Sequence, residues 1–458
     1  MNPLIPASGA VLMILAAGFG ASVLFLRRAQ RIAVAELIVL SWLFGTLVVS
    51  FGLWLLGMGL RGASLHVAVT VVCFASAITG ILFLRRGKQR LHLPRPKNWF
   101  ESFLALLICL EVAIVFFLAF KNSLGWDGLL IWEVKARYAF LNGGAVPAAY
   151  FSDTSRIYSH TEYPLYLPML ETWVYFWTGD CDQYSVKLIF PIFYVAGILL
   201  LAQAGTAWSG KRWIGLLVAN LFFFVPFLTC AEGGVLQGYA DVPISVVYLA
   251  AFYFLSIFAR ENSRTALETF VALSASLPWI KRDGIVLWFV LVVCGVWIIW
   301  RRNGILPAIL SVLTGICVIA GWQVYLRQMD LRAPGDFLPM TLPVLISNFD
   351  RLVPVTRLLL KEATTMKHWS LLWYLTPIAF LCLMWRNRSE RAVVLLICTT
   401  LPLALDCAIY LFSSWPDYLH HVRFSLPRLV LQVAPLAMLS VASALAPRQM
   451  PVSNKRAA

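Results

Sequence analysis

Apolar stretches of about twenty residues recur along almost the whole chain, and this feature constrains the fold more than any other. An α-helix needs roughly 20 apolar residues to cross the hydrocarbon core of a bilayer, and the first stretch, Leu4 to Leu26, is long enough. Strands of outer-membrane barrels alternate in polarity and are about half as long, so that class is excluded. The composition agrees, because 60% of the 458 residues are hydrophobic and 13% are charged, against about 25% charged in a soluble domain. The sequence therefore predicts an all-α polytopic membrane protein.

The basic residues predict how the chain threads the membrane. Lys and Arg gather in short clusters directly beside apolar stretches, as is typical of cytoplasmic loops: Arg27, Arg28 and Arg31; Arg85, Arg86, Lys88, Arg90, Arg95 and Lys97; Arg301 and Arg302; Arg386, Arg388 and Arg391. With these clusters in the cytoplasm, the chain forms about thirteen spans, with its amino terminus outside and its carboxyl terminus inside. The expected spans are 4–26, 33–59, 65–84, 101–120, 184–204, 213–230, 242–258, 265–280, 284–300, 304–326, 369–385, 392–412 and 426–446. Because much of the net charge of +15 follows the spans in this way, it indicates topology rather than binding to nucleic acid.

The spans divide the chain into three parts. Residues 1–84 are expected to form an N-terminal three-helix membrane module, residues 85–446 the main transmembrane bundle, and residues 447–458 a short cytoplasmic tail. The stretch 164–177 is apolar but short, and it opens with prolines. We therefore expect a re-entrant or interfacial helix there, on the outer face.

Three outer segments are long and polar enough to build a site: 121–163, 327–368 and 413–425. They carry more basic residues than an outer location leads one to expect, including Lys135, Arg137 and Arg423. Two explanations stay open. Long loops cross the membrane largely regardless of charge, or the outer cations bind the phosphate of a lipid carrier through charge-assisted hydrogen bonds.

Asp127 is the candidate general base. The sequence Gly125-Trp126-Asp127-Gly128 follows directly on an expected span, so the carboxylate should lie at a helix end, with Trp126 and Trp132 as apolar walls. Partial desolvation raises the basicity of such a carboxylate, and rigid placement brings it within reach of an acceptor hydroxyl. An Asp at a helix end is also commonly a cap or turn residue, and that alternative stays open.

Two further motifs place polar side chains beside apolar stretches. His160, Glu162 and Tyr163 directly precede the stretch 164–177, where they could orient a sugar or a lipid phosphate, or form an ordinary polar helix entry. Asp241 begins a span and has the form of a helix N-cap, which by itself would account for it.

Lys281-Arg282-Asp283-Gly284 interrupts two spans that have almost no connecting loop. Lys281 and Asp283 are two residues apart and would not share a helix face, so a broken helix between Pro278 and Gly284 is expected. Charges wedged between spans are costly and usually functional.

Taken in order, these four motifs resemble the integral-membrane glycosyltransferases of the GT-C superfamily. They are most similar to bacterial members related to the protein mannosyltransferases and lipid A aminoarabinose transferase, over roughly residues 100–300. The resemblance implies a GT-C-like bundle with outer-face interfacial helices, in the cytoplasmic (inner) membrane of a bacterium with its active site outside. It further implies a transferase that takes a monosaccharide from a polyprenyl-phosphate carrier, with inversion, and passes it to a lipid, glycan or protein acceptor.

The resemblance also implies roles for single residues. Asp127 matches the family's general base, and Asp241 matches a second outer acid that supports the substrate pocket. Lys281 matches a basic residue that contacts the donor phosphate, and Asp283 stands where a Glu is common. Many relatives have a second acid beside the base, whereas Asp127 has only Glu133 nearby, so no metal site is assigned and no obligatory cation is expected. Relatives also reach this loop after their first span, so residues 1–84 are expected to serve partner docking or acceptor entry.

Two other functions stay open. A lipid-linked glycan polymerase or ligase would depend on arginine and histidine in a late outer loop, as Arg351, Arg357 and His368 could provide. A flippase or transporter for lipid-linked sugars would place basic groups around a cavity. Against a transporter, the polar residues gather at one membrane face rather than at the midplane, and the sequence shows no internal repeat.

Overall fold

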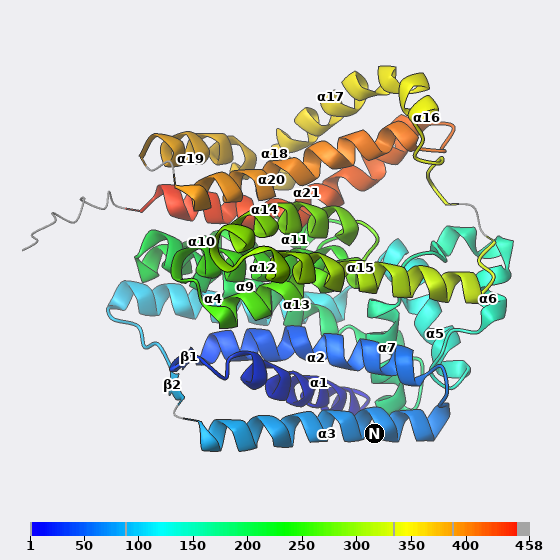
Figure 1. Ribbon diagram of the computed structural model, residues 1–458. Helices are drawn as coiled ribbons and strands as arrows, with labels where there is room; N and C mark the ends of the chain where they lie inside the picture. The colour runs from blue at the N-terminus through cyan, green and yellow to red at the C-terminus, as the bar shows by residue number, and fades with distance from the viewer. Residues whose placement is uncertain (1, 88, 333–334, 387–388, 447–458) are drawn as a thin grey trace, which may run out of the picture.

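The computed structural model describes residues 2–87, 89–332, 335–386 and 389–446, and it has the predicted class, an all-α multi-pass membrane protein. Ten helical segments are long and apolar enough to cross a membrane, and they lie alongside one another in one bundle (Figure 1). They are α1 (Leu4–Phe25), α2 (Val34–Leu56), α3 (Gly62–Arg86), α4 (Trp99–Lys121), α8 (Gln183–Val186) with α9 (Ile189–Ser209), α12 (Asp241–Glu261), α14 (Gly284–Asn303), α15 (Ile305–Gln328), α20 (Glu390–Ile409) with the turn η4 (Tyr410–Phe412), and α21 (Tyr418–Ala444). The expected tail 447–458, together with Lys88 and Arg388, lies outside the described residues.

Three of the expected spans form shorter helices. These are α10 (Arg212–Phe223), α13 (Arg264–Ile280) and α19 (Leu372–Arg386), with 12, 17 and 15 residues. The expected span 213–230 breaks because Pro226 has no N–H to continue a helix and instead begins a separate turn, α11 (Pro226–Cys230). The expected number of thirteen crossings therefore stays a prediction, with ten found in the described part of the chain.

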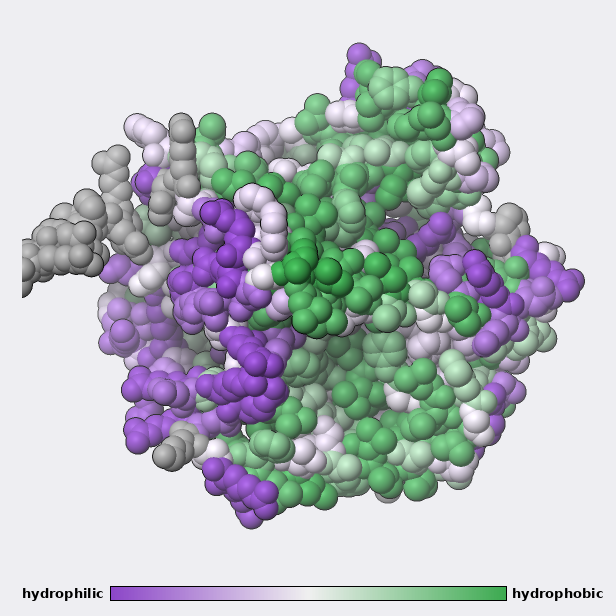
Figure 2. Space-filling view, viewed as in Figure 1, coloured by the Kyte–Doolittle hydropathy of each residue, from purple (hydrophilic) through white to green (hydrophobic). Residues whose placement is uncertain are grey.

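Basic residues gather at one end of the bundle, which we call the basic end and define by Arg27, Arg28, Arg85, Arg86, Arg301, Arg302, Arg386 and Arg391. A short parallel pair of strands, β1 (Arg31–Ala33) and β2 (Arg90–His92), joins two connections there, with Arg31 opposite Arg90. This pair has no counterpart in the predicted all-helical pattern. In Figure 2, hydrophilic side chains cover this end, on the left of the view.

The opposite end, which we call the loop end, is built from the long connections 122–165, 329–371 and 413–417. The first contains the π-helical turn η1 (Gly128–Glu133), α5 (Val134–Leu141), α6 (Ala148–Ser152) and the 3₁₀ turn η2 (Thr154–Ser159), and it leads into α7 (Tyr166–Thr178). The second contains α16 (Leu342–Ser347), η3 (Phe349–Arg351), α17 (Leu352–Ala363) and α18 (Met366–Trp369). The third is shorter than the expected loop 413–425, because Asp417 caps α21 at the backbone N–H of His420 and Arg423 therefore lies on a helix.

Packing explains which helices form the core. Helix α12 is buried along nearly its whole length, and α9 and α21 pack against it. Helices α1 and α2 approach closely, since a side chain at Gly18 or Gly45 would collide with the backbone of the other helix. Both also contact α7, which is buried from Tyr166 to Tyr175. Residues 1–84 thus pack directly on the main bundle.

Exposed apolar residues mark the surface that lipid would cover. They line α3 (Val67, Val71, Phe74, Ile78) and α15 (Ile309, Leu310, Leu313, Ile316). Figure 2 shows this apolar surface between the two polar ends of the molecule. Such a continuous patch is expected of a protein whose solvent is a bilayer.

Candidate active site

A cavity of about 810 Å³ opens at the loop end of the bundle. Its walls come from three segments far apart in the sequence: residues of 126–163, residues 335–339, and residues of 414–428 at the start of α21. Of the residues singled out from the sequence, Trp126, Asp127, His160 and Tyr163 line it. Its size is within the range of about 300–1,000 Å³ that is usual for small-molecule sites.

Close backbone packing fixes the position of Asp127. The N–H of Gly125 donates to the carbonyl of Gln237 at 2.8 Å, and a side chain at Gly128 would come within 2.4 Å of the same oxygen. The backbone N–H of Asp127 donates to the hydroxyl of Tyr239 at 3.2 Å. The two glycines around Asp127 therefore let the segment lie against residues 237–239, which holds the carboxylate in the cavity wall with 5% of the residue exposed.

Arg428 of α21 is the partner of the Asp127 carboxylate. Its Nη1 donates to Asp127 Oδ2, and its guanidinium lies over the rings of Tyr239 and Phe424, at 5.6 and 5.2 Å from their centroids. Its Nε is buried and has no hydrogen-bond partner among the described residues. The cavity therefore contains a buried carboxylate–guanidinium pair in which donor capacity of the guanidinium is left unused.

His160 belongs to a second charged group in the same cavity. Its Nδ1 lies 2.9 Å from Asp336 Oδ2 and 3.9 Å from Glu162 Oε1. Burial alone would lower the pKa of His160, but the hydrogen bonds and charges of Asp336 and Glu162 raise it to about 9, so the ring is a cation at neutral pH. Burial acts in the opposite direction on Asp336, where the bonds from His160 and the indole of Trp415 lower the pKa to about 2.

His160, Glu162 and Asp336 are the one group in the described chain whose ligand atoms lie close enough together to hold a metal ion, within 4.8 Å of one another. Both carboxylates already have further partners, however. Glu162 pairs with Arg282 at 3.3 Å, and Asp336 accepts from Trp415 at 3.0 Å. With a cationic His160, the group is a network of compensating charges as it stands.

Lys281, Asp241 and Asp283 form a third group, which does not line the cavity. The Lys281 ammonium lies 2.8 Å from Asp241 Oδ1 and 2.7 Å from Asp283 Oδ2, and 5% of the residue is exposed. Gln432 donates to both carboxylates. Burial opposes the charged form of Lys281, but the two carboxylates outweigh it and raise the pKa of Lys281. Because Gln432 follows Arg428 by one helical turn, this group lies next to the Asp127–Arg428 pair.

The remaining candidates of the first loop lie outside the cavity. Lys135 is fully buried between the rings of Trp132 and Tyr163, and it donates to the carbonyl of His160 at 2.6 Å. Burial lowers the pKa of Lys135 to about 7, although the charge of Glu162 works against this shift. Lys135 and Trp132 thus support the segment that carries His160. Arg137 pairs instead with Glu133.

The basic residues of the late loops also lie outside the cavity. Arg423 is exposed on α21 and does not line it. Arg351 donates to the carbonyl of Ser413 at 3.0 Å, and His368 contacts Glu362 at 2.6 Å. Neither they nor Arg357 reach the cavity that contains Asp127.

Sequence reasoning missed several residues of this site. Asp336 stands among apolar and glycine residues of a long loop, and nothing in the sequence indicates that it meets His160. In the sequence, Arg428 is one more basic residue close to an outer loop. A stronger signal was present, because Arg428 and Gln432 are polar, lie four residues apart in an apolar span and therefore share a helix face.

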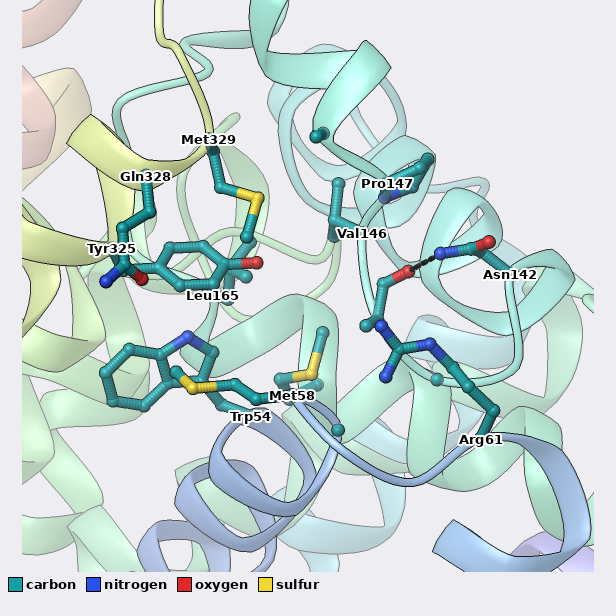
Figure 3. Close-up of a pocket in the computed structure, with 15 residues that line it drawn as sticks. Trp54, Met58, Arg61, Asn142, Val146, Pro147, Leu165, Tyr325, Gln328 and Met329 are labelled. Atoms are coloured by element: carbon teal, nitrogen blue, oxygen red, sulfur yellow. Dashed lines mark hydrogen bonds between the residues drawn. The ribbon is translucent and has the colours of Figure 1, made fainter.

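A second cavity of about 430 Å³ lies beside the first. Figure 3 shows Trp54 and Tyr325 on one side of it and Arg61 and Asn142 on the other. The segment 160–165 contributes to both cavities, His160 and Tyr163 to the first and Leu165 to the second, and the indole of Trp322 fixes it by donating to the carbonyl of Glu162 at 2.9 Å. None of the described residues that line this cavity is an Asp, Glu or His, so they supply no side chain suited to a general base.

The first cavity thus combines a carboxylate that can accept a proton, two cations that can stabilise an anion, and an exposed aromatic ring, Trp126. That set is suited to proton abstraction from a hydroxyl beside a negatively charged leaving group. Comparisons with family models, with curated proteins and with solved structures found no match to this chain.

Proposed function

We propose that this protein is a membrane glycosyltransferase of the GT-C type, which moves a monosaccharide from a polyprenyl-phosphate carrier to a hydroxyl group of an acceptor. The observation that carries the proposal is the position of Asp127, a buried carboxylate in the wall of a cavity at one end of a bundle of apolar helices. A site at the end of such a bundle is within reach of both a lipid-linked donor and a water-exposed acceptor.

The orientation follows from the distribution of charge. The arginines of the basic end lie beside the ends of apolar helices, which is the arrangement of cytoplasmic loops. The loop end then faces the outside, which in a bacterial inner membrane is the periplasm. The donor would be used on that side.

The chemistry is a direct displacement. Asp127 takes the proton of the acceptor hydroxyl, the hydroxyl oxygen attacks the anomeric carbon, and the lipid phosphate leaves from the opposite side, which inverts the configuration. His160 and Arg428 are the cations of the cavity, and they stabilise the charge that develops on the phosphate. Trp126 offers an exposed aromatic surface to the sugar or to the first carrier unit.

The buried group has a supporting role in this proposal. Lys281, Asp241 and Asp283 join the ends of α12, α13 and α14, and Gln432 ties them to α21. They therefore hold the part of α21 that carries Arg428 rather than touch the donor.

The remaining features of the GT-C expectation are part of the same proposal. Helices α10, α13 and α19, although shorter, complete the thirteen crossings, and α7 is a re-entrant helix of the outer half. The helices of residues 1–84 serve partner docking or entry of the acceptor, which is a lipid, a glycan or a protein.

A transfer assay tests the proposal. Purified protein in nanodiscs is given radiolabelled polyprenyl-phosphate sugars and a lipid and glycan extract, alongside the variants Asp127→Asn and Asp180→Asn. Asp180 is an exposed acid in the short connection between α7 and α8, does not line the cavity and serves as the matched control. A labelled product formed by the wild type and by Asp180→Asn, but not by Asp127→Asn, supports the transferase. Donor that binds or crosses the bilayer without being consumed would contradict it in favour of a flippase.

A further inference from the structure

We propose that Arg428 exchanges partners during the reaction: it holds Asp127 in the empty site and moves to the donor phosphate when the donor binds, which releases the base. This inference rests on the proposed function and names how that same site is controlled. It makes the donor the first substrate to bind, because the acceptor meets a free base only afterwards.

The first argument is the scarcity of available cations. Arg428 is the one Arg or Lys among the described residues that line the cavity. His160 is a cation there as well, but it is held by Asp336 and Glu162. Lys281 is enclosed by two carboxylates outside the cavity. A phosphate that enters the cavity therefore has Arg428 as its principal partner.

The second argument is the unused capacity of the guanidinium. Nη1 makes its one hydrogen bond to the described residues, to Asp127, and Nε is buried without a partner. A guanidinium has five N–H donors in a planar fork that matches two oxygens of a phosphate. The resting pair is thus one-pronged, whereas a phosphate can engage the fork with two oxygens.

The third argument is that the surroundings favour movement of the head group. The guanidinium lies over the rings of Tyr239 and Phe424, which bind a cation through their faces without fixing its direction. Phe424 is 46% exposed. The helix that carries Arg428 is held one turn further on by Gln432, so the side chain can turn while its backbone stays in place.

The exchange couples the two halves of the reaction. The bound donor is a phosphodiester with one negative charge, and its glycosidic C–O bond breaks with the electron pair going to the phosphate oxygen. The phosphate then carries a second negative charge, which Arg428 stabilises. At the same time the acceptor O–H bond breaks, its oxygen bonds to the anomeric carbon, and its proton goes to the Asp127 carboxylate and from there to water.

The exchange makes an unusual prediction about binding, since Asp127 and the phosphate compete for one cation. Asp127→Asn should lose transfer and yet bind a polyprenyl phosphate about tenfold more tightly than the wild type, a typical size for a coupling between two ligands of one group. Arg428→Gln should bind it about tenfold more weakly. The double variant should bind like Arg428→Gln, because removal of Asp127 has no effect on binding once the cation that it withholds is absent.

The experiment measures the affinity of each variant for a polyprenyl monophosphate in nanodiscs, with inorganic phosphate as a second probe. Arg327→Gln, which removes an exposed arginine at the loop end, is the matched control and should bind like the wild type. Thermal unfolding of each variant shows whether it is folded. Inorganic phosphate should give the same order of variants, which assigns the exchange to the head group.

Two results would overturn the exchange. Asp127→Asn that binds as the wild type does would show that Asp127 does not withhold Arg428. A gain in affinity from Asp127→Asn that persists in the Arg428→Gln background would be a general effect of removing a negative charge. The affinity measurements do not depend on transfer, so the two proposals can fail separately. The predicted affinities without any transfer would count against the transferase alone. Active transfer without the predicted affinities would count against the exchange alone.

Discussion

The two acid–base groups beside α21 have similar composition and different surroundings. Asp127 and Arg428 line a cavity, whereas Lys281 and Asp241 are buried and, like the partly exposed Asp283, do not line it. Arg428 of the first group and Gln432, which contacts the second, are one turn apart on α21. Among the described residues, the open pair leaves guanidinium donor capacity unused, while the buried ammonium is shared by two carboxylates. The comparison teaches that a charge wedged between apolar helices has two possible uses, and that access to a cavity distinguishes them. The open pair is suited to chemistry and the enclosed group to structure.

The largest effect is expected when the same substitution is made in each group. Asp127→Asn should lower the rate of transfer by about 10²–10⁴-fold, the usual contribution of a general base, while the protein still folds. Asp241→Asn should instead lower the unfolding temperature, because it leaves Lys281 with one fewer carboxylate. Single-turnover rates and thermal unfolding in detergent measure both. The comparison fails if Asp127→Asn transfers sugar normally.

Removal of the enclosed cation should act on stability. Lys281→Met leaves the buried Asp241 carboxylate without its cation, and the partly exposed Asp283 as well, and should cost about 3–5 kcal/mol, as broken buried pairs do. The same variant should keep the KM for the donor if enough folded protein is recovered. A stable Lys281→Met protein with a raised donor KM would instead place Lys281 at the phosphate.

A smaller effect, up to about 3 kcal/mol, is expected from the titration of His160. Its pKa is raised from 6.5 to about 9, so its contribution to stability is complete below pH 6.5 and is lost as the pH rises through about 9. Lys135 acts on the stability of the fold in the opposite direction. Its pKa is lowered from 10.5 to about 7, so its contribution makes the fold more stable as the pH rises between these two values. Lys135 is present both in the wild type and in His160→Gln, so its contribution cancels in the difference between their unfolding temperatures.

That difference should shrink as the pH rises from 6.5 to 9. Equal sensitivity to pH in the two proteins would show that His160 is not the titrating group. Asp336 affects stability only at acidic pH. Its pKa is lowered from 3.8 to about 2, so its contribution to stability is lost only as the pH falls through that range.

The smallest effect is expected from a chelator. His160, Glu162 and Asp336 are balanced by one another and by Arg282, so EDTA should leave the transfer rate unchanged. Transfer that stops with EDTA and returns with a divalent cation would reverse this expectation and would assign the ion to these three residues.

The fold was more accessible to sequence reasoning than the site. Long apolar stretches identify membrane helices because each one satisfies its own backbone hydrogen bonds, a local property. The break at Pro226 is local too and could have been predicted from the proline. The pairing of β1 with β2 could not, since it depends on two connections that meet only in the bundle.

The site depends on contacts between distant residues. Asp127, His160 and Tyr163 were singled out because polar side chains beside apolar stretches are conspicuous, and all three line the cavity. The resemblance implies a phosphate role for Lys281, but the sequence does not show that Asp241 lies beside it. The same limit hid Asp336, which meets His160 only through the fold of the second long loop.

Photocrosslinking with the lipid carrier of the donor tests the central claim most directly. The wild-type protein in nanodiscs is labelled with a polyprenyl phosphate that carries a photoreactive group next to its phosphate, and the labelled peptides are mapped. The account predicts label in segments 126–131, 157–163 and 420–428, the walls of the cavity around Asp127. Label confined to the second cavity near Trp54, or to the apolar groove between α14 and α20 near Trp297, would contradict it.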